Sequence, residues 1–191
     1  MKRALPWIFA LVAGLLVVLA GFALRWPSAP APGSGGDFAL QTQDGPISLA
    51  GLRGKVVLLY FGYTYCPDVC PTALTSYGAA LRRLSPETLE RVAVVFVSVD
   101  PERDTLPHLK EYAAFFHPKI IGATGTPTQI QTIARQYGVF YVKRAVNESG
   151  NYSVDHTSES YLIAPDGHLA ERLPHGASPE VLATAIQRWL P

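Results

Sequence analysis

Two nearly uninterrupted apolar runs constrain the fold of this chain more than any other feature of its sequence. They cover residues 56–61 (VVLLYF) and 92–99 (VAVVFVSV), and each is followed by apolar residues at helical spacing. A run without polar alternation is typical of a strand that is buried on both faces. Because such strands belong to sheets with helices on both faces, the sequence predicts an α/β fold.

The order of the other predicted elements narrows this class to one arrangement. In chain order the pattern predicts a hairpin over 38–49, a strand at 56–61, a helix over 74–84, a strand at 92–99, helices over 109–116 and 126–137 around a short strand at 120–123, a strand at 140–145, a polar loop at 147–158, hairpin strands at 161–164 and 169–173, and a helix from 178. A central βαβ unit followed by a terminal ββα unit is the thioredoxin arrangement. We therefore expect a thioredoxin-like mixed sheet with helices on both faces and an N-terminal hairpin extension.

The most apolar part of the chain precedes this domain. Residues 5–24 hold 17 apolar residues and no charge, and 20 helical residues reach about 30 Å, the thickness of a hydrocarbon core. The start Met1-Lys2-Arg3 would stay on the cytoplasmic side. A cleaved signal peptide is the alternative, with Gly21 and Ala23 as a small-x-small site. We expect one transmembrane helix within an anchor of residues 1–25, a Pro/Gly/Ala linker over 26–36, and a domain over 37–191 on the periplasmic side of a bacterial inner membrane.

Charge gives little indication of a partner. The chain carries 16 basic and 15 acidic residues. Three of the basic residues, Lys2, Arg3 and Arg25, flank the apolar segment, so the predicted domain is slightly acidic. No Lys/Arg cluster occurs in it, and the sequence therefore argues against nucleic acid as a partner.

The two cysteines, Cys66 and Cys70, are the chemical centre of the sequence. They follow the first buried run, where α/β sheets place their binding sites, and Pro71 suits the first turn of a helix. The positive end of that helix favours thiolate. A purely structural disulfide is the alternative, although a bridge over three residues removes little unfolded-state entropy. Dithiol oxidoreductases use C-x-x-C; the C-x-x-x-C spacing here suits two soft thiolates that hold Cu(I), or Cu(II) with a nitrogen ligand.

Three motifs, taken in order along the chain, indicate a particular protein family. YFGYTYCPDVCP, followed by VSVDPERDT and by DHTSESYLIAPDG, resembles the Sco/SenC family of membrane-anchored, thioredoxin-like copper proteins that help assemble the copper site of cytochrome c oxidase. The resemblance implies copper ligation by Cys66, Cys70 and His156, and it aligns Asp100 with the family's aspartate in the D-P-x-R-D-T segment. One departure is Tyr65, which stands where histidine or asparagine is frequent.

The residues themselves support these assignments unequally. His156 precedes the strand at 161–164, in a region that faces the cysteine pair in thioredoxin-like folds, and its neighbour Asp155 can orient the imidazole; a surface histidine is the alternative. Asp100 ends the second buried run, which brings it near Cys66, or it is an ordinary turn aspartate before proline. Arg103 and Asp104 are expected to cap the next helix or to form a solvated pair. The other histidines, at 108, 117, 168 and 175, have weaker cases.

Three functions fit these residues. The first is a copper metallochaperone, not an enzyme, whose partners are the copper-site subunit of cytochrome c oxidase and a periplasmic copper donor or thiol reductant. The second is an enzyme, a thiol-disulfide oxidoreductase that keeps the oxidase cysteines reduced by means of Cys66 and Cys70. The third is a zinc site, because two cysteines, a histidine and water are also a catalytic zinc pattern. Copper requires His156, whereas thiol exchange does not.

Overall fold

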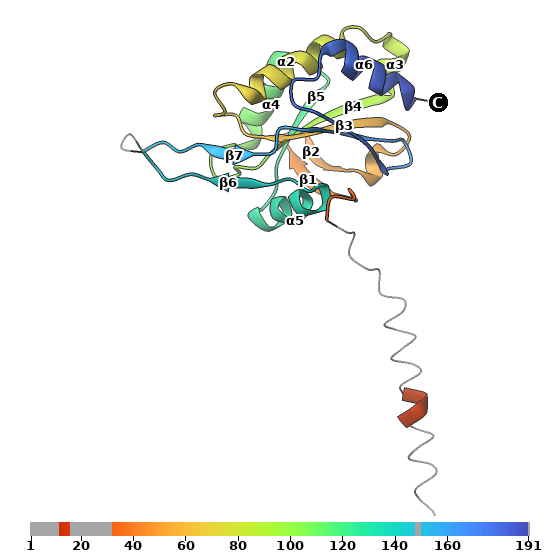
Figure 1. The fold of residues 1–191 in the computed structure, drawn as a ribbon, viewed down its shortest axis with the longest axis vertical. Helices are drawn as coiled ribbons and strands as arrows, with labels where there is room; N and C mark the ends of the chain where they lie inside the picture. Colours follow the sequence, from red (N-terminus) through yellow and green to blue (C-terminus); the bar gives the residue numbers. More distant parts are fainter. Residues whose placement is uncertain (1–11, 16–31, 148–149, 191) are drawn as a thin grey trace, which may run out of the picture. The chain divides into compact units, whose positions relative to one another are not determined.

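The computed structural model describes residues 12–15, 32–147 and 150–190 (Figure 1). The chain divides into two units, Met1–Pro30 and Ala31–Pro191. The second unit contains β1 (Ala39–Thr42), β2 (Gly45–Ser48), a 3-10 turn η1 (Ala50–Leu52), β3 (Val56–Gly62), α2 (Val69–Leu81), α3 (Pro86–Glu90), β4 (Val92–Ser98), α4 (Leu106–Phe116), β5 (Ile120–Ala123), α5 (Pro127–Tyr137), β6 (Tyr141–Lys143), β7 (Val154–His156), β8 (Ser160–Ile163), β9 (Leu169–Leu173) and α6 (Pro179–Arg188).

A five-stranded mixed sheet forms the centre of this unit. Its strand order is β5-β4-β3-β8-β9. Strands β3, β4 and β5 are parallel, and β8 and β9 are antiparallel to their neighbours. Every residue of β3 and β4 is buried, because both faces of these central strands are covered and only apolar side chains suit both. The two apolar runs of the sequence are therefore the middle of the sheet, as predicted.

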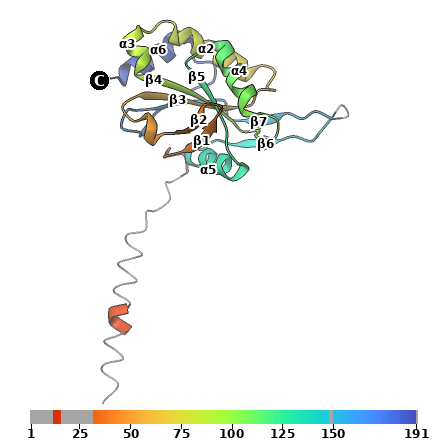
Figure 2. The same cartoon turned by 180° about the vertical axis from the view of Figure 1, so that it is seen from behind.

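Helices cover both faces of the sheet, as expected for a thioredoxin-like fold. Figures 1 and 2 show α2 and α6 on one side of the sheet and α5 on the other. Each helix buries the apolar stripe that its sequence predicts: Leu74, Tyr77 and Leu81 in α2, Ile130, Ile133 and Tyr137 in α5, and Leu182 and Ile186 in α6. Gly138 ends α5 with φ of 71°, a left-handed conformation that glycine adopts without strain.

Two hairpins are added to this core. The first pairs β1 with β2, which confirms the N-terminal hairpin extension, and it meets the sheet through backbone hydrogen bonds between Gln41 and Thr124. The second pairs β6, which confirms the strand predicted at 140–145, with β7, which corrects the polar loop predicted at 147–158. It places His156 at the end of a strand, opposite Tyr141.

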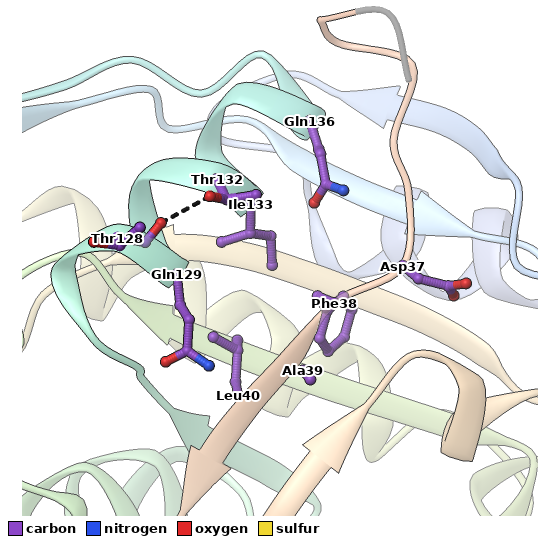
Figure 3. Close-up of a pocket in the computed structure, with 9 residues that line it drawn as sticks. All are labelled: Asp37, Phe38, Ala39, Leu40, Thr128, Gln129, Thr132, Ile133 and Gln136. Atoms are coloured by element: carbon purple, nitrogen blue, oxygen red, sulfur yellow. Dashed lines mark hydrogen bonds between the residues drawn. The ribbon is translucent and has the colours of Figure 1, made fainter. Parts of the chain in front are cut away.

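A hollow of about 280 Å³ lies between β1 and α5 (Figure 3). Its floor is apolar, with Phe38, Leu40 and Ile133, and Gln129 and Gln136 stand at its rim. None of the residues that line it belongs to the predicted metal site.

The predicted transmembrane helix needs correction, and so does the single-pass location in a bacterial inner membrane that depended on it. Within the described ranges, the structure contains no helix with the length and apolar character needed to cross a membrane. Of the apolar segment 5–24, only residues 12–15 are described, and they are helical. The rest of the predicted anchor, and the linker up to residue 31, lie outside the described residues. The domain boundaries at 25 and 36 stay a prediction.

Candidate metal centre

The cysteines lie where the central strand β3 ends and α2 begins. Cys66 belongs to the loop between Gly62 and Val69, and Cys70 is the second residue of α2. Cys70 is fully buried, Cys66 is 8% exposed, and no disulfide joins them. This confirms the expected position at the carboxyl end of a parallel strand and at a helix N-terminus.

His156 reaches the cysteines from the β6–β7 hairpin. Its Nε2 lies 3.3 Å from the Sγ of Cys70, and its Nδ1 lies 3.0 Å from the carbonyl oxygen of Thr157. A carbonyl oxygen only accepts hydrogen bonds, so Nδ1 carries a proton and, in the neutral ring, Nε2 keeps its lone pair on the side of the sulfurs. The two sulfurs and one imidazole nitrogen all lie within 4.8 Å of one another. Two thiols and an available nitrogen are a donor set that fits copper.

The two thiols differ in acidity. The pKa of Cys66 is lowered, chiefly because the Cys70 thiol donates a hydrogen bond to its thiolate, and burial opposes this shift. The same hydrogen bond, together with burial, raises the pKa of Cys70. Cys66 is therefore the first of the pair to ionise.

The wall behind the cysteines is closely packed. A Cβ atom on Gly62 would lie 2.6 Å from the Sγ of Cys70 and 2.8 Å from the ring of Phe96, so only glycine allows the strand to approach this sulfur. The rings of Tyr60 and Tyr63 meet the His156 ring edge to face, with centroids 6.2 and 5.9 Å away. Burial raises the pKa of Tyr60.

An open pocket of about 340 Å³ gives access to part of this site. Tyr63 and residues 66–69 line one side of it, and residues 153–156 with Ser158 line the other. Cys66 and His156 border the pocket, whereas Cys70 does not. A metal ion or a partner protein can therefore reach Cys66 first.

Asp100 and Asp155, the two carboxylates predicted around the ligands, have partners of their own. Asp100 is buried and accepts hydrogen bonds from Nε of Arg103 at 2.5 Å and from the hydroxyl of Tyr152 at 2.9 Å. Asp155 forms an ion pair with Arg144 at the surface. Among the hydrogen bonds described, neither carboxylate contacts a cysteine or the imidazole ring. Their roles at a metal stay predictions.

Asp104 is a site residue that the sequence did not reveal. Its carboxylate is 1% exposed and accepts hydrogen bonds from the backbone NH of Thr64 at 3.0 Å, the hydroxyl of Thr64 at 2.5 Å and the hydroxyl of Ser98 at 2.5 Å. It thereby fixes the loop that carries Cys66 instead of capping α4. His108 also approaches this loop, with Nε2 3.1 Å from the Thr64 hydroxyl, but it does not join the cysteine–histidine group.

Comparison with known proteins agrees with the sequence motifs. The SCO1/SenC family model matches residues 27–191. The chain belongs to the SCO1/SenC family. It is similar to the mitochondrial SCO1 homolog 1 of Arabidopsis thaliana, with 44% identity over 141 residues, which are 73% of this chain and 42% of that protein. It spans 42% to 62% of the length of this relative and of the bovine and mouse SCO2 homologs.

Solved SCO1/SenC structures resemble the fold along most of its length. The copper-bound ScoI of Bradyrhizobium japonicum is 37% identical, with a TM-score of 0.75 over 82% of this chain and 99% of that one. The copper-bound Arabidopsis thaliana ScoI is 38% identical, with a TM-score of 0.73 over 82% and 97%. BsSco, described as a member of the Sco family of cytochrome c oxidase assembly proteins with a disulfide switch, is 25% identical, with a TM-score of 0.63 over 84% and 95%.

Proposed function

We propose that this SCO1/SenC protein binds one copper ion through Cys66, Cys70 and His156 and acts as a metallochaperone in assembly of the copper site of cytochrome c oxidase. The observation that carries the proposal is the convergence of two sulfurs and an imidazole nitrogen within 4.8 Å. Copper-bound relatives, and a relative described as an oxidase assembly protein, support it. The partners would be the copper-site subunit of the oxidase and a copper donor.

The donor set suits both oxidation states of copper in different ways. Soft thiolates select Cu(I), which the two cysteines can hold alone, whereas Cu(II) prefers additional, harder ligands such as imidazole. Copper is the cargo here, and the open pocket beside Cys66 gives it a route in and out.

Copper titration of the reduced full chain tests this proposal. We expect one equivalent to bind in either oxidation state, and the Cu(II) complex to show an intense thiolate charge-transfer band and nitrogen coupling in its EPR spectrum. A sample oxidised to the Cys66–Cys70 disulfide is the control and should not bind, because it has no thiolate left. One-to-one binding of zinc, with no thiolate band from copper, would contradict the proposal and favour the zinc interpretation.

A thiol-disulfide oxidoreductase is the second candidate, favoured by the unequal cysteines. Cys66 borders the open pocket and has the lowered pKa, as an attacking thiolate needs, while Cys70 is buried behind it. The Cys66 thiolate would attack a disulfide of the partner, break its S–S bond, release one partner thiolate and form a mixed disulfide with the other sulfur. Cys70 would then displace the partner's second thiol and close the Cys66–Cys70 bridge. Two electrons pass to the partner, and a thiol reductant must restore the dithiol.

His156→Ala separates the two candidates, with His168→Ala, in an exposed turn, as the matched control. A metallochaperone loses Cu(II) affinity and oxidase assembly in cells, and keeps more of its Cu(I) affinity. A reductase keeps most of its thiol exchange and supports normal assembly, because exchange depends on the cysteines, and the Cys70 thiol is the main cause of the lowered pKa of Cys66. Normal oxidase activity in cells whose variant no longer binds Cu(II) would contradict the metallochaperone function and favour the thiol-disulfide oxidoreductase.

A further inference from the structure

Arg103 lies where three separate parts of the site meet. Its side chain, 18% exposed, stands between the turn after β4, the loop that carries Cys66 and the β6–β7 hairpin that carries His156. The sequence predicts that it caps the next helix or forms a solvated pair. Its side chain instead contacts residues of the site, because the turn, the cysteine loop and the hairpin each contribute a neighbour.

Two contacts attach Arg103 to the hairpin. Its Nη1 donates a hydrogen bond to the carbonyl oxygen of Tyr152 at 2.9 Å, and its guanidinium carbon lies 3.5 Å from the centroid of the Tyr152 ring. The Tyr152 hydroxyl in turn donates to Asp100, the same carboxylate that accepts from Nε of Arg103. Arg103, Asp100 and Tyr152 therefore form a closed ring of contacts between β4 and the hairpin.

The opposite side of the guanidinium faces the cysteine loop. Its carbon lies 4.7 Å from the ring centroid of Tyr65 and 5.6 Å from that of Tyr63, and Tyr63 also contacts the His156 ring. The Nη2 atom is buried and has no hydrogen-bond partner among the described residues. Burial of a cation that lacks some of its hydrogen-bond acceptors costs free energy. The aromatic rings and the Asp100 carboxylate offset this cost by attracting the guanidinium.

These contacts matter because the hairpin lies outside the central sheet. Its other contacts include the side chain of Val154, which is buried in the core, and an exposed ion pair between Lys143 and Glu102. Strands β6 and β7 have three residues each and form a sheet of their own, apart from the central five strands. Tyr152 precedes His156 by four residues, about 13 Å of extended chain. The position of Tyr152 therefore restricts where the imidazole can lie.

We propose that Arg103 is a positioning residue that holds the β6–β7 hairpin, and with it His156, against the cysteine pair. The inference rests on the proposed copper function. It predicts that loss of Arg103 impairs the nitrogen ligand and spares the two thiols. Lysine cannot replace it, because only the planar guanidinium can stack on a ring and donate in two directions at once.

The test compares Arg103→Met and Arg103→Lys with Arg83→Met, which removes an arginine from an exposed ion pair with Glu180. The first readout uses no metal. In the reduced, metal-free full chain, we expect the hairpin amides of Arg144 and Thr157, bonded to Ser153 and Phe140, to exchange hydrogen at least about tenfold faster in both Arg103 variants. Amides of β3 and β4 should be unchanged, and the Arg83 variant should match the parent protein.

The second readout uses copper alone. Both Arg103 variants should lose at least about tenfold in Cu(II) affinity, within the range that loss of a residue orienting a ligand costs, and weaken the nitrogen coupling in the EPR spectrum. Their Cu(I) affinity should change less than about threefold. If Arg103→Met does not fold, Tyr152→Leu makes a partial test with the same expected direction: it removes the ring and hydroxyl that attach the hairpin, and it leaves Asp100 paired with Arg103.

The two readouts separate this proposal from the proposed function. Hairpin exchange at the parental rate in the Arg103 variants would overturn the positioning role, and so would Cu(I) and Cu(II) affinities that fall equally. If the parent chain binds no copper but the hairpin amides still exchange faster in the variants, the copper function fails while the positioning of His156 by Arg103 stands.

Discussion

The cysteines and the histidine of the candidate site belong to parts of the molecule that are held in different ways. The cysteine loop starts from β3, all of whose residues are buried, and continues into α2, whose inner face belongs to the core. The β6–β7 hairpin lies outside the central sheet, and both Val142 and Lys143 of β6 are exposed. Core packing therefore fixes the two thiols, whereas the hairpin that carries the imidazole is held by one core residue, Val154, and a few side-chain contacts.

This difference has a chemical consequence for a protein that binds copper. A pair of thiols held by the core can retain Cu(I) whatever the hairpin does, while a Cu(II) site needs the hairpin in place. Movement of the hairpin would then change the affinity for one oxidation state more than for the other. The predictions below test this division, from the largest expected effect to the smallest.

Replacing either cysteine should remove one of the two thiolate ligands, which the hairpin cannot replace. Cys66→Ser and Cys70→Ser should each lower both Cu(I) and Cu(II) affinity by more than about 100-fold, because even the loss of a residue that only orients a ligand costs about 10–100-fold. Competition with chelators of known affinity measures this. Retention of Cu(I) affinity in Cys70→Ser would show that the buried thiol is not a ligand and would undo the comparison.

The acidity of the two thiols sharpens the comparison within the cysteine pair. The lowered pKa of Cys66 keeps it a thiolate as the pH falls, whereas the raised pKa of Cys70 keeps it protonated. Between pH 8 and pH 6 an ordinary thiol loses about 100-fold in thiolate. We expect alkylation of Cys66 in the reduced, metal-free protein to slow much less than this, and Cys70 to remain unlabelled.

Mass spectrometry of the labelled peptides measures both rates. The same chain in urea is the control, since both cysteines should then react alike and slow as ordinary thiols do. Faster labelling of Cys70 than of Cys66 in the folded protein would contradict the assignment of Cys66 as the attacking thiol.

The sequence predicts the core-held half of the site better than the hairpin. Strand β3 and the cysteines after it follow from an apolar run and a helix start, which are local signals. Of the hairpin, the sequence predicts only the first strand, at 140–145; β7 has no such signal, because it is three residues long and lies within a polar segment. Arg103 and Asp104 illustrate the same limit: their partners, Tyr152 and Thr64, lie 49 and 40 residues away, and no local pattern indicates such contacts. His156 is predicted as a ligand from its family motif, although β7, the strand that carries it, is not predicted.

Asp104 offers a way to disturb the cysteine loop without touching a ligand. Asp104→Asn replaces one accepting oxygen with a donor that faces the donors of Thr64 and Ser98, so we expect the free energy of unfolding to fall by about 1–3 kcal/mol. Urea unfolding of the metal-free protein measures this, with Asp44→Asn, at the surface, as the matched control. Cu(I) and Cu(II) affinity should fall together, unlike in the Arg103 variants. A loss confined to Cu(II) would show that Asp104 acts through the hairpin.

Asp155 gives the smallest expected effect and tests what orients His156. The sequence suggests that this carboxylate holds the ring, but it pairs with Arg144, and Nδ1 of His156 is bonded to the backbone of Thr157. Arg144 also lowers the pKa of Asp155, so the pair persists as the pH falls toward the ordinary range of a carboxyl group. We therefore expect Asp155→Ala and its matched control Arg144→Ala to change Cu(II) affinity less than about threefold, as is usual for exposed pairs. A loss of about 10–100-fold in Asp155→Ala alone, the usual cost of removing the carboxylate behind a metal-bound histidine, would mean that Asp155 leaves Arg144 for the ring once copper binds.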